Sequence, residues 1–369
     1  MNYSKTLHFI TNILSLSVCP NRRVALKRQM QDGSFDWERV LQVSSEHLVL
    51  PALYVSLNRA KLLDVLPSDL QTYLEHITQL NRIRNQRNLE QASEINGLLN
   101  SHDIQPIFLK GTAHLLEGLY TDLGERMIGD IDFLVAPEKM VKTADLLVSQ
   151  GYSAMSVYSS ENFVSTKHYP RMIHKDKVFA IEIHKDVIQK VSYRQLDYSQ
   201  INAAKRNVKG YFLPSYTDLL LHNMMNTQLN DNGFILSSLN LRQKYDFILL
   251  SQFEKPITVI KKFKHHHLSL ISYLVKSAYL FDEVEQLEHP KNIWSFWVYW
   301  LTALKLKYPK PFKVVTGVTF LIWRMSRDLS LAAEYLPQKN KRTRVLKYIV
   351  DSEHRSIYFQ QLFNRLKSL

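Results

Sequence analysis

The stretch Gly129-Asp130-Ile131-Asp132-Phe133-Leu134-Val135 decides the fold, because acidic and apolar residues alternate in it. Such alternation is typical of a strand with one face in a core. Asp130 and Asp132 then point to the same face, where neighbouring carboxylates repel each other and resist desolvation. A divalent cation removes this penalty, and oxygen ligands favour Mg²⁺ or Mn²⁺. The pattern therefore predicts a metal-binding strand, and the alternative is an exposed sheet edge with solvated carboxylates.

A short turn upstream of this strand has the composition of a phosphate-binding loop. Residues 104–109 form an apolar run that predicts a strand, and Lys110, Gly111 and Thr112 then open a predicted helix. Gly111 lets a ligand approach the backbone, and the free N–H groups of a first helical turn bind phosphate. Thr112 adds a hydroxyl group. A Gly-Thr pair is a weak signal alone, and the acidic strand that follows strengthens it.

A third carboxylate lies on another predicted strand, Phe179-Ala180-Ile181-Glu182-Ile183-His184. The period of two places Glu182 and His184 together on the face opposite the two isoleucines. Residues 171–174 predict the hairpin partner of this strand. If the strand pairs beside the Asp-containing strand, three carboxylates meet. His184 then either contacts substrate or is a structural histidine.

Hydrophobic periodicity divides the chain into three regions. Residues 1–98 predict packing helices without evident chemistry, residues 99–213 predict an α/β core, and residues 214–369 predict helices again. Only ten glycines are present, which argues against a glycine-rich β architecture. The predicted fold class is α+β, with a small mixed sheet flanked by N- and C-terminal helical regions.

Several local patterns predict individual elements. Residues 152–157 form a candidate edge strand, and Ser215 has the character of a helix N-cap. Arg242 and Asp246 stand in an i,i+4 relation on a predicted helix. Aromatic residues concentrate in residues 294–323, where we expect a core, although a membrane-facing surface is the alternative.

Composition narrows the compartment and the class of enzyme. The single cysteine, Cys19, excludes an intramolecular disulfide and a cysteine-based zinc cluster, and it fits a reducing compartment. No stretch has the length and apolarity of a membrane-spanning helix, and the N-terminus lacks the charge order of a signal peptide. We therefore expect a cytoplasmic protein. The chain has no His-Glu-x-x-His, P-loop or Gly-x-Ser-x-Gly motif, so metalloprotease, kinase-type and hydrolase functions lack support.

The formal net charge of +13 is unevenly distributed. Residues 301–369 contain fourteen Lys and Arg against four Asp and Glu, a net charge of +10. A basic surface attracts nucleic acid, anionic lipid or polyanionic substrate. The alternative is the solvated helix surface of a basic protein.

The arrangement of turn, Asp-x-Asp strand and third carboxylate resembles the nucleotidyltransferase superfamily related to DNA polymerase β. It is closer to a bacterial family of uncharacterised nucleotidyltransferase proteins, with which it shares four motifs: Leu109-Lys110-Gly111, Arg126-Met127-Ile128-Gly129-Asp130-Ile131-Asp132-Phe133-Leu134-Val135, His168-Tyr169-Pro170 and Glu182-Ile183-His184. The resemblance covers roughly residues 35–250. The chain departs from better-known superfamily members in its longer gap between Gly111 and Asp130.

The resemblance implies transfer of a nucleoside monophosphate from an NTP, ATP among them, to a hydroxyl acceptor, with release of pyrophosphate. The acceptor class stays open among a sugar, a small metabolite, a protein and an RNA. The implied catalytic residues also hold two Mg²⁺ or Mn²⁺ ions, and they are Asp130, Asp132 and Glu182. The implied nucleotide-binding residues are Lys110, Gly111, Thr112, Arg126 and His184.

Alternatives remain for several of these roles. Arg126 is either a phosphate ligand or a structural ion-pair partner of Asp122 or Glu125, and Lys110 is either a ligand or solvated. His168 and His174 reach the site if the predicted hairpin folds over it. The whole protein is otherwise an inactive regulatory nucleotide-binding protein, or a basic protein that binds nucleic acid or a membrane surface.

Overall fold

The computed structural model describes residues 2–32, 36–155, 168–188, 196–263 and 267–338, together with residues 342, 352, 356, 359 and 360. The chain divides into two compact units. The first comprises Met1–Asp231 and Leu239–Tyr299, and the second comprises Asn232–Ser238 and Trp300–Leu369. The sheet and every candidate site residue belong to the first unit. The expected boundaries after residues 98 and 213 stay a prediction.

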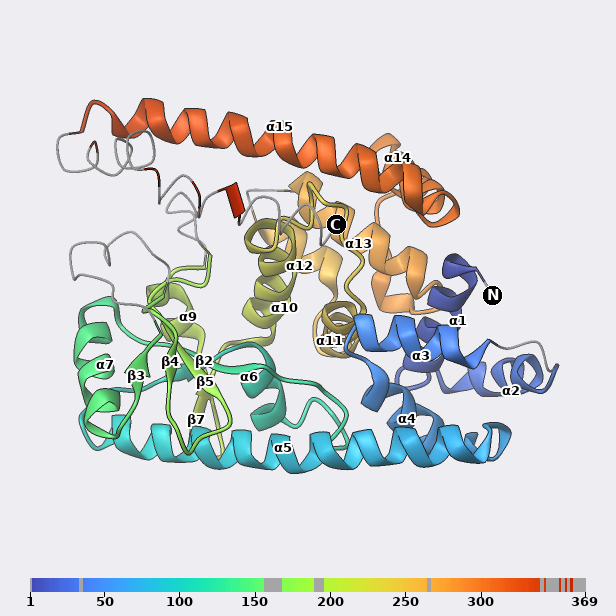
Figure 1. Ribbon diagram of the computed structural model, residues 1–369, viewed down its shortest axis with the longest axis horizontal. Helices are drawn as coiled ribbons and strands as arrows, with labels where there is room; N and C mark the ends of the chain where they lie inside the picture. The colour runs from blue at the N-terminus through green and yellow to red at the C-terminus, as the bar shows by residue number, and fades with distance from the viewer. Residues whose placement is uncertain are drawn as a thin grey trace. The chain divides into compact units, whose positions relative to one another are not determined.

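The chain begins with amphipathic helices that bury one another's apolar faces, as their hydrophobic spacing requires. These helices are α1 (Tyr3–Ser15), α2 (Arg23–Gln31), α3 (Trp37–Glu46), α4 (Leu50–Arg59) and the long α5 (Ser68–Asn100). Helix α1 contacts α3 and α4, and α4 packs on the first part of α5. Figure 1 shows α5 running from α4 to the sheet, so this one helix connects the N-terminal helices with the site-bearing core.

Helix α5 carries a buried polar stripe, which its sequence spacing places on one face. The Asn81 side chain donates hydrogen bonds to the carbonyls of Gly124 and Arg126, at 2.7 and 3.0 Å. Asn85 donates to the Arg126 carbonyl at 2.7 Å. Gln91 donates to the Phe179 carbonyl and accepts from its N–H, at 2.8 and 3.2 Å. The stripe therefore satisfies the backbone of the segments that precede both site strands.

A seven-stranded mixed sheet confirms the predicted α+β class. Its spatial order is β3-β4-β5-β2-β1-β7-β6. The strands are β1 (Ile107–Phe108), β2 (Asp130–Leu134), β3 (Ser153–Ala154), β4 (Met172–Ile173), β5 (Ala180–His184), β6 (Arg206–Val208) and β7 (Tyr211–Leu213). Strand β2 lies antiparallel to β1 and parallel to β5 near the centre, so the strand with the alternating carboxylates is paired on both sides.

The strand predictions hold where alternation is strong and fall short at the edges. The hairpin of β4 and β5 forms, and the candidate edge strand at residues 152–157 shortens to β3, with residues 156 and 157 outside the described part. Sequence analysis missed the β6–β7 hairpin. Its turn is Lys209-Gly210, both with positive φ (52° and 87°), and the available signal was an X-Gly pair followed by the short apolar run Tyr211–Leu213.

Of the remaining α-helices that the structure describes, three lie between strands in the sequence and the others follow the last strand. They are α6 (Lys110–Glu117), α7 (Met140–Ser149), α9 (Tyr198–Ala204), α10 (Tyr216–Met225), α11 (Leu241–Leu250), α12 (Pro256–Lys262), α13 (His267–Leu280), α14 (Ile293–Lys307) and α15 (Pro309–Tyr335). Ser215 caps α10 as predicted, because its side chain accepts from the Asp218 N–H. Among the helices described, none is both long enough and apolar enough to cross a membrane.

The polar stripe of α5 makes a testable contribution to stability. Asn85→Ala removes one hydrogen bond from the part-buried carbonyl of Leu123 and one from the buried carbonyl of Arg126. We expect the free energy of unfolding to fall by about 2–3 kcal/mol, measured by urea denaturation. Gln86→Ala, on the adjacent exposed position, is the control and is expected to cost under about 0.5 kcal/mol. Equal losses in the two variants would contradict this role of the stripe.

Candidate active site

The site forms where strands β2 and β5 lie side by side in parallel register. Asp132 is the direct cross-strand partner of Glu182, and Leu134 is the partner of His184. The odd-numbered residues of both strands, such as Ile131, Ile181 and Ile183, are fully buried in the core. The alternation seen in the sequence therefore fixes the polar face, while pairing of the two strands brings the carboxylates together.

Three side chains converge on this polar face. The Nε2 atom of His184 lies 2.8 Å from Oδ1 of Asp132 and 3.5 Å from Oε2 of Glu182. One ligand atom from each of the three side chains falls within a span of 4.8 Å. Asp132 and His184 are buried, and the Glu182 side chain is 18% exposed. The group is thus enclosed on the core side and reachable from solvent through Glu182.

Lys110 inserts its ammonium between the two carboxylates. Its Nζ atom lies 2.5 Å from Oδ1 of Asp132 and 3.9 Å from Oε2 of Glu182. Lys110 is the first residue of α6 and has φ +49°, a left-handed conformation that costs a non-glycine residue about 1 kcal/mol. The preceding residue is fixed against β2, because the Leu109 N–H donates to the Asp132 carbonyl at 2.9 Å. This hydrogen bond brings the Lys110 backbone close to the Asp132 side chain.

The charges of these groups stabilise one another. Burial raises the pKa of Asp132, but Lys110 and the hydrogen bond with His184 outweigh burial and hold that pKa well below its usual range. Contact with His184 lowers the pKa of Glu182, against burial and the charge of Asp132. Burial lowers the pKa of Lys110, but Asp132 outweighs burial and the net shift is upward. At neutral pH the site therefore contains two carboxylates and one ammonium.

Asp130 lies on the same strand but outside this cluster. Burial, followed by repulsion from Asp132, raises the pKa of Asp130 to about 6. Its nearest cation apart from Lys110 is Arg171, whose Nη2 atom lies 3.8 Å from Oδ2 of Asp130. Within the described residues, Asp132, Glu182 and His184 form one group that could hold a metal ion, and the metal role of Asp130 stays a prediction.

Gly111 and Thr112 lie in the first turn of α6, next to the carboxylates. A Cβ atom on Gly111 would come within 3.0 Å of the Ile128 side chain, so glycine permits the close packing of α6 on the segment before β2. Thr112 is buried, and its hydroxyl has no hydrogen-bond partner within the part of the chain described. The predicted phosphate-binding roles of both residues stay predictions.

Arg126 forms an ion pair that the sequence did not indicate. Its Nε and Nη2 atoms donate to the two carboxylate oxygens of Asp246, at 3.0 and 2.7 Å. Tyr120 also donates to Asp246, and the pair is almost fully buried. Asp122 and Glu125, the predicted alternative partners, instead pair with Arg82 and Arg59. Asp246, expected beside Arg242 on its own helix, therefore turns to the core.

Two further residues reach the site from the segment before β4. His168 forms a β-bridge with His184, and their ring centroids lie 5.3 Å apart. Arg171, which carried no predicted role, approaches Asp130. His174 lies elsewhere, because its ring packs against Tyr152 at a centroid distance of 5.1 Å. Both neighbours come from a hairpin whose position depends on sheet pairing rather than on a local motif.

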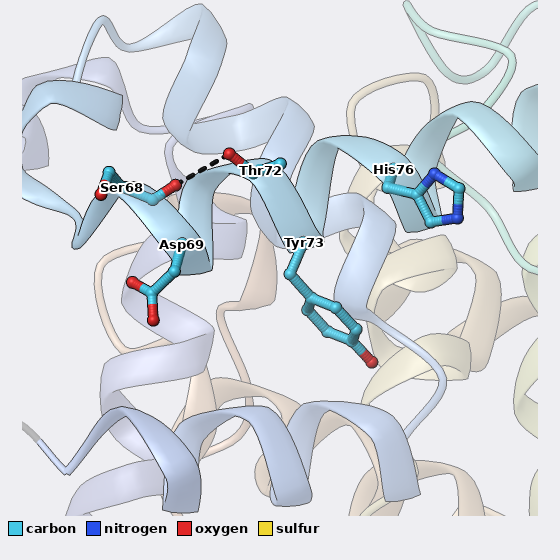
Figure 2. Close-up of a pocket in the computed structure, with 5 residues that line it drawn as sticks. All are labelled: Ser68, Asp69, Thr72, Tyr73 and His76. Atoms are coloured by element: carbon cyan, nitrogen blue, oxygen red, sulfur yellow. Dashed lines mark hydrogen bonds between the residues drawn. The ribbon is translucent and has the colours of Figure 1, made fainter.

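A separate surface depression lies on α5 and has no such convergence. Figure 2 shows its lining: Ser68, Asp69, Thr72, Tyr73 and His76, all from one helix. All five residues are exposed. The only hydrogen bond drawn joins the Thr72 hydroxyl to the Ser68 carbonyl at 2.9 Å, within the helix itself. The β2–β5 site is therefore the candidate for the chemistry.

Comparison with known proteins agrees with this geometry. The model of a family described as an uncharacterised nucleotidyltransferase matches residues 33–268, more than half of the chain. The protein therefore belongs to this nucleotidyltransferase family, which makes it a transferase with a nucleotide substrate. No curated protein and no solved structure matches the chain.

The donor atoms fit a divalent cation of the kind that nucleotidyltransferases usually use. Asp132 and Glu182 offer carboxylate oxygens, and His184 offers Nε2. An imidazole ligand is compatible with Mn²⁺ and other transition metals, whereas Mg²⁺ prefers oxygen ligands. The ammonium of Lys110 lies close to the Asp132 oxygen that a metal would use. A bound ion would therefore take the place beside Asp132 that the Lys110 ammonium occupies.

The raised pKa of Asp130 predicts a pH-dependent cost. Its folded pKa of about 6 lies above the ordinary value of 3.8, so the contribution of this one carboxyl to stability is most favourable below about pH 4 and is lost as pH rises through 6. Asp130→Asn removes this cost. Without metal at pH 7.5 we expect a gain of roughly 1–2 kcal/mol in unfolding free energy, discounted for the 32% exposure of the side chain.

The measurement is urea denaturation in EDTA at pH 4 and pH 7.5. The gain from Asp130→Asn is expected to shrink strongly at the lower pH, where the wild-type carboxyl is protonated in the folded state and partly protonated in the unfolded state. Asp145→Asn, at an exposed position of α7, is the control and should change little at either pH. A variant no more stable than wild type at pH 7.5 would show that Asp130 is not destabilised by its surroundings.

Proposed function

We propose that this protein is a metal-dependent nucleotidyltransferase that moves a nucleoside monophosphate from an NTP to a hydroxyl acceptor. The observation that carries the proposal is the parallel register that sets Asp132 beside Glu182, with His184 and Lys110 in contact with them. Two adjacent carboxylates with an ammonium lower the stability of the fold because burying their charges costs solvation energy. The same groups can bind a metal ion through the carboxylates and a triphosphate through the ammonium.

The proposed reaction is a single displacement at the α-phosphorus. The acceptor oxygen forms a bond to this phosphorus, the bond to the bridging oxygen of the β-phosphate breaks, and pyrophosphate leaves. Asp132, Glu182 and His184 would hold the cation, which would supply charge neutralisation for the phosphates and a lower pKa for the acceptor hydroxyl. Glu182 is the proposed acceptor of the hydroxyl proton, because it is the most exposed member of the group.

The phosphate-binding part of the proposal rests on the start of α6. Lys110, displaced from Asp132 by the cation, would bind the triphosphate, together with the backbone N–H groups of Gly111 and Thr112. The buried hydroxyl of Thr112 without a partner supports a ligand contact there.

Asp130 would hold a second Mg²⁺ or Mn²⁺ ion with Asp132. ATP is a proposed donor, and the acceptor is a sugar, a small metabolite, a protein or an RNA.

Transfer of ³²P from α-labelled NTPs tests this function. Wild-type protein with Mg²⁺ or Mn²⁺ is expected to label a component of the host lysate or the protein itself. Asp132→Asn should reduce transfer by at least about 10³-fold, because the variant loses the central ligand. Asp145→Asn, an equal charge change on an exposed helix, should retain transfer.

Other outcomes separate the alternatives. NTP binding that depends on metal and on Asp132, with no transfer to any lysate component, would favour an inactive regulatory nucleotide-binding protein. Equal transfer by wild type and Asp132→Asn would contradict the proposed metal site. Thermal unfolding of each variant, measured in parallel, ensures that loss of activity is not loss of fold.

A second function is proposed for helix α15 of the second unit: contact with an anionic membrane surface. Val314, Val318, Ile322, Met325 and Leu329 recur at helical spacing and are each 51–69% exposed. The helix also carries lysines and arginines, within a C-terminal region of net charge +10. A helix with an exposed apolar stripe and basic residues binds lipid headgroups. The expected aromatic core at residues 294–323 is only partial, since Phe296 and Trp300 are exposed as well.

Vesicle flotation tests this contact. Wild-type protein is expected to float with vesicles that contain phosphatidylglycerol and to stay behind with pure phosphatidylcholine. Ile322→Asp, which adds a charge to the stripe, should reduce the bound fraction at least about fivefold. Thr319→Asp adds the same charge at an exposed position beside the stripe and is the control. Equal binding of all three proteins to both vesicles would exclude α15 as the contact.

A further inference from the structure

Arg242 approaches the site from helix α11, outside the sheet. It is the second residue of that helix, and its Nη1 atom donates to the Met127 carbonyl at 3.2 Å. Met127 precedes Asp130 by three residues, on the segment that enters β2. Arg126 donates to the same carbonyl at 2.5 Å, so two guanidinium groups meet at one acceptor.

The two guanidinium groups differ in charge compensation. The charge of Arg126 is neutralised by Asp246, whose carboxylate accepts hydrogen bonds from the Nε and Nη2 atoms of Arg126. Arg242 stands one helical turn before Asp246 yet forms no ion pair with a carboxylate in the part of the chain the structure describes. Its Nε atom is buried and has no hydrogen-bond partner there. Arg242 therefore contributes a largely buried positive charge that has no direct ion-pair partner among the described residues.

This arrangement is costly without a ligand. Burial, followed by repulsion from Arg126, lowers the pKa of Arg242 from 12.5 to about 10, which still leaves the group charged at neutral pH. Attraction to Asp246, to Tyr120 and, least of the three, to Asp130 partly offsets the shift, so the guanidinium also feels a carboxylate of the site. A neutral side chain would suit the apo protein better. Binding sites are where proteins retain such charges.

We infer that Arg242 is an anion-binding residue of the nucleotide site, and that its ligand is the triphosphate of the NTP. The inference rests on the proposed function, and it adds a contact from the C-terminal helices to a site otherwise built by the sheet and α6. Arginine suits this task because its planar donors match two phosphate oxygens at once. Arg242 still has Nε free, with one Nη atom engaged by Met127. Phosphate binding there would supply the missing counter-charge.

The test compares Arg242→Gln with Arg87→Gln, which removes the same charge from an exposed position of α5. Binding of NTP, NMP and pyrophosphate is measured by calorimetry with Mn²⁺ present. Arg242→Gln should weaken NTP and pyrophosphate binding at least about tenfold and NMP binding about threefold or less. Arg242→Lys should recover part of the affinity. Arg87→Gln should stay within twofold of wild type.

A second readout excludes a merely structural role. Because Arg242 carries a largely buried charge without a direct ion pair among the described residues, the thermal midpoint of ligand-free Arg242→Gln should equal or exceed that of wild type. A lowered midpoint together with unchanged NTP affinity would make Arg242 structural and overturn the inference. An equal loss of affinity for NMP and NTP would assign the contact to the nucleoside side and also overturn it.

The inference and the proposed function fail in distinguishable ways. If wild-type protein binds NTP and Arg242→Gln binds it equally well, only the inference fails. If wild-type protein binds neither NTP nor pyrophosphate with Mn²⁺, the proposed function fails and the inference falls with it. A weakening for pyrophosphate alone, with NTP affinity intact, would place Arg242 at a product contact and contradict its role in holding the triphosphate of the substrate.

Discussion

The site depends on one constraint: two carboxylates that share a sheet face must be neutralised. The strand register sets Asp132 beside Glu182. In the folded chain the ammonium of Lys110 and the imidazole of His184 contact the Asp132 carboxylate. Lys110, the first residue of α6, contacts Asp132 while its backbone has a left-handed conformation. Strand β2 and the start of α6 are thus linked by the neutralisation of Asp132. A bound cation would neutralise this carboxylate in place of Lys110.

The surrounding structure holds this arrangement through buried polar contacts. Side-chain amides of α5 satisfy the backbone before β2, and the Arg126–Asp246 pair ties that same segment to α11. A buried ion pair adds little net stability because desolvation consumes most of the Coulomb energy. Its effect here is geometric: it fixes the backbone that leads into Asp130, and it leaves Arg242 beside the site without a carboxylate of its own.

Membership of the nucleotidyltransferase family and the geometry of the site answer different questions. The family gives the class of reaction and of substrate. The geometry shows which side chains of this chain lie together, and a histidine, His184, lies beside the carboxylates of Asp132 and Glu182. Three local features that cost stability lie at or near this site: the repelled Asp130, the positive φ of Lys110 and the largely buried Arg242 without a direct ion pair among the described residues.

The sequence by itself determined the strand with Asp130 and Asp132, the turn at Lys110 and the strand with Glu182, because period-2 alternation and turn chemistry are local. It also determined the α+β class. Only the tertiary structure decided that His184 joins the two carboxylates and that Asp246 pairs with Arg126 rather than with Arg242. The physical reason is that ion pairs and ligand sets depend on distances between residues far apart in the chain. An i,i+4 pattern predicts only contacts within one helix.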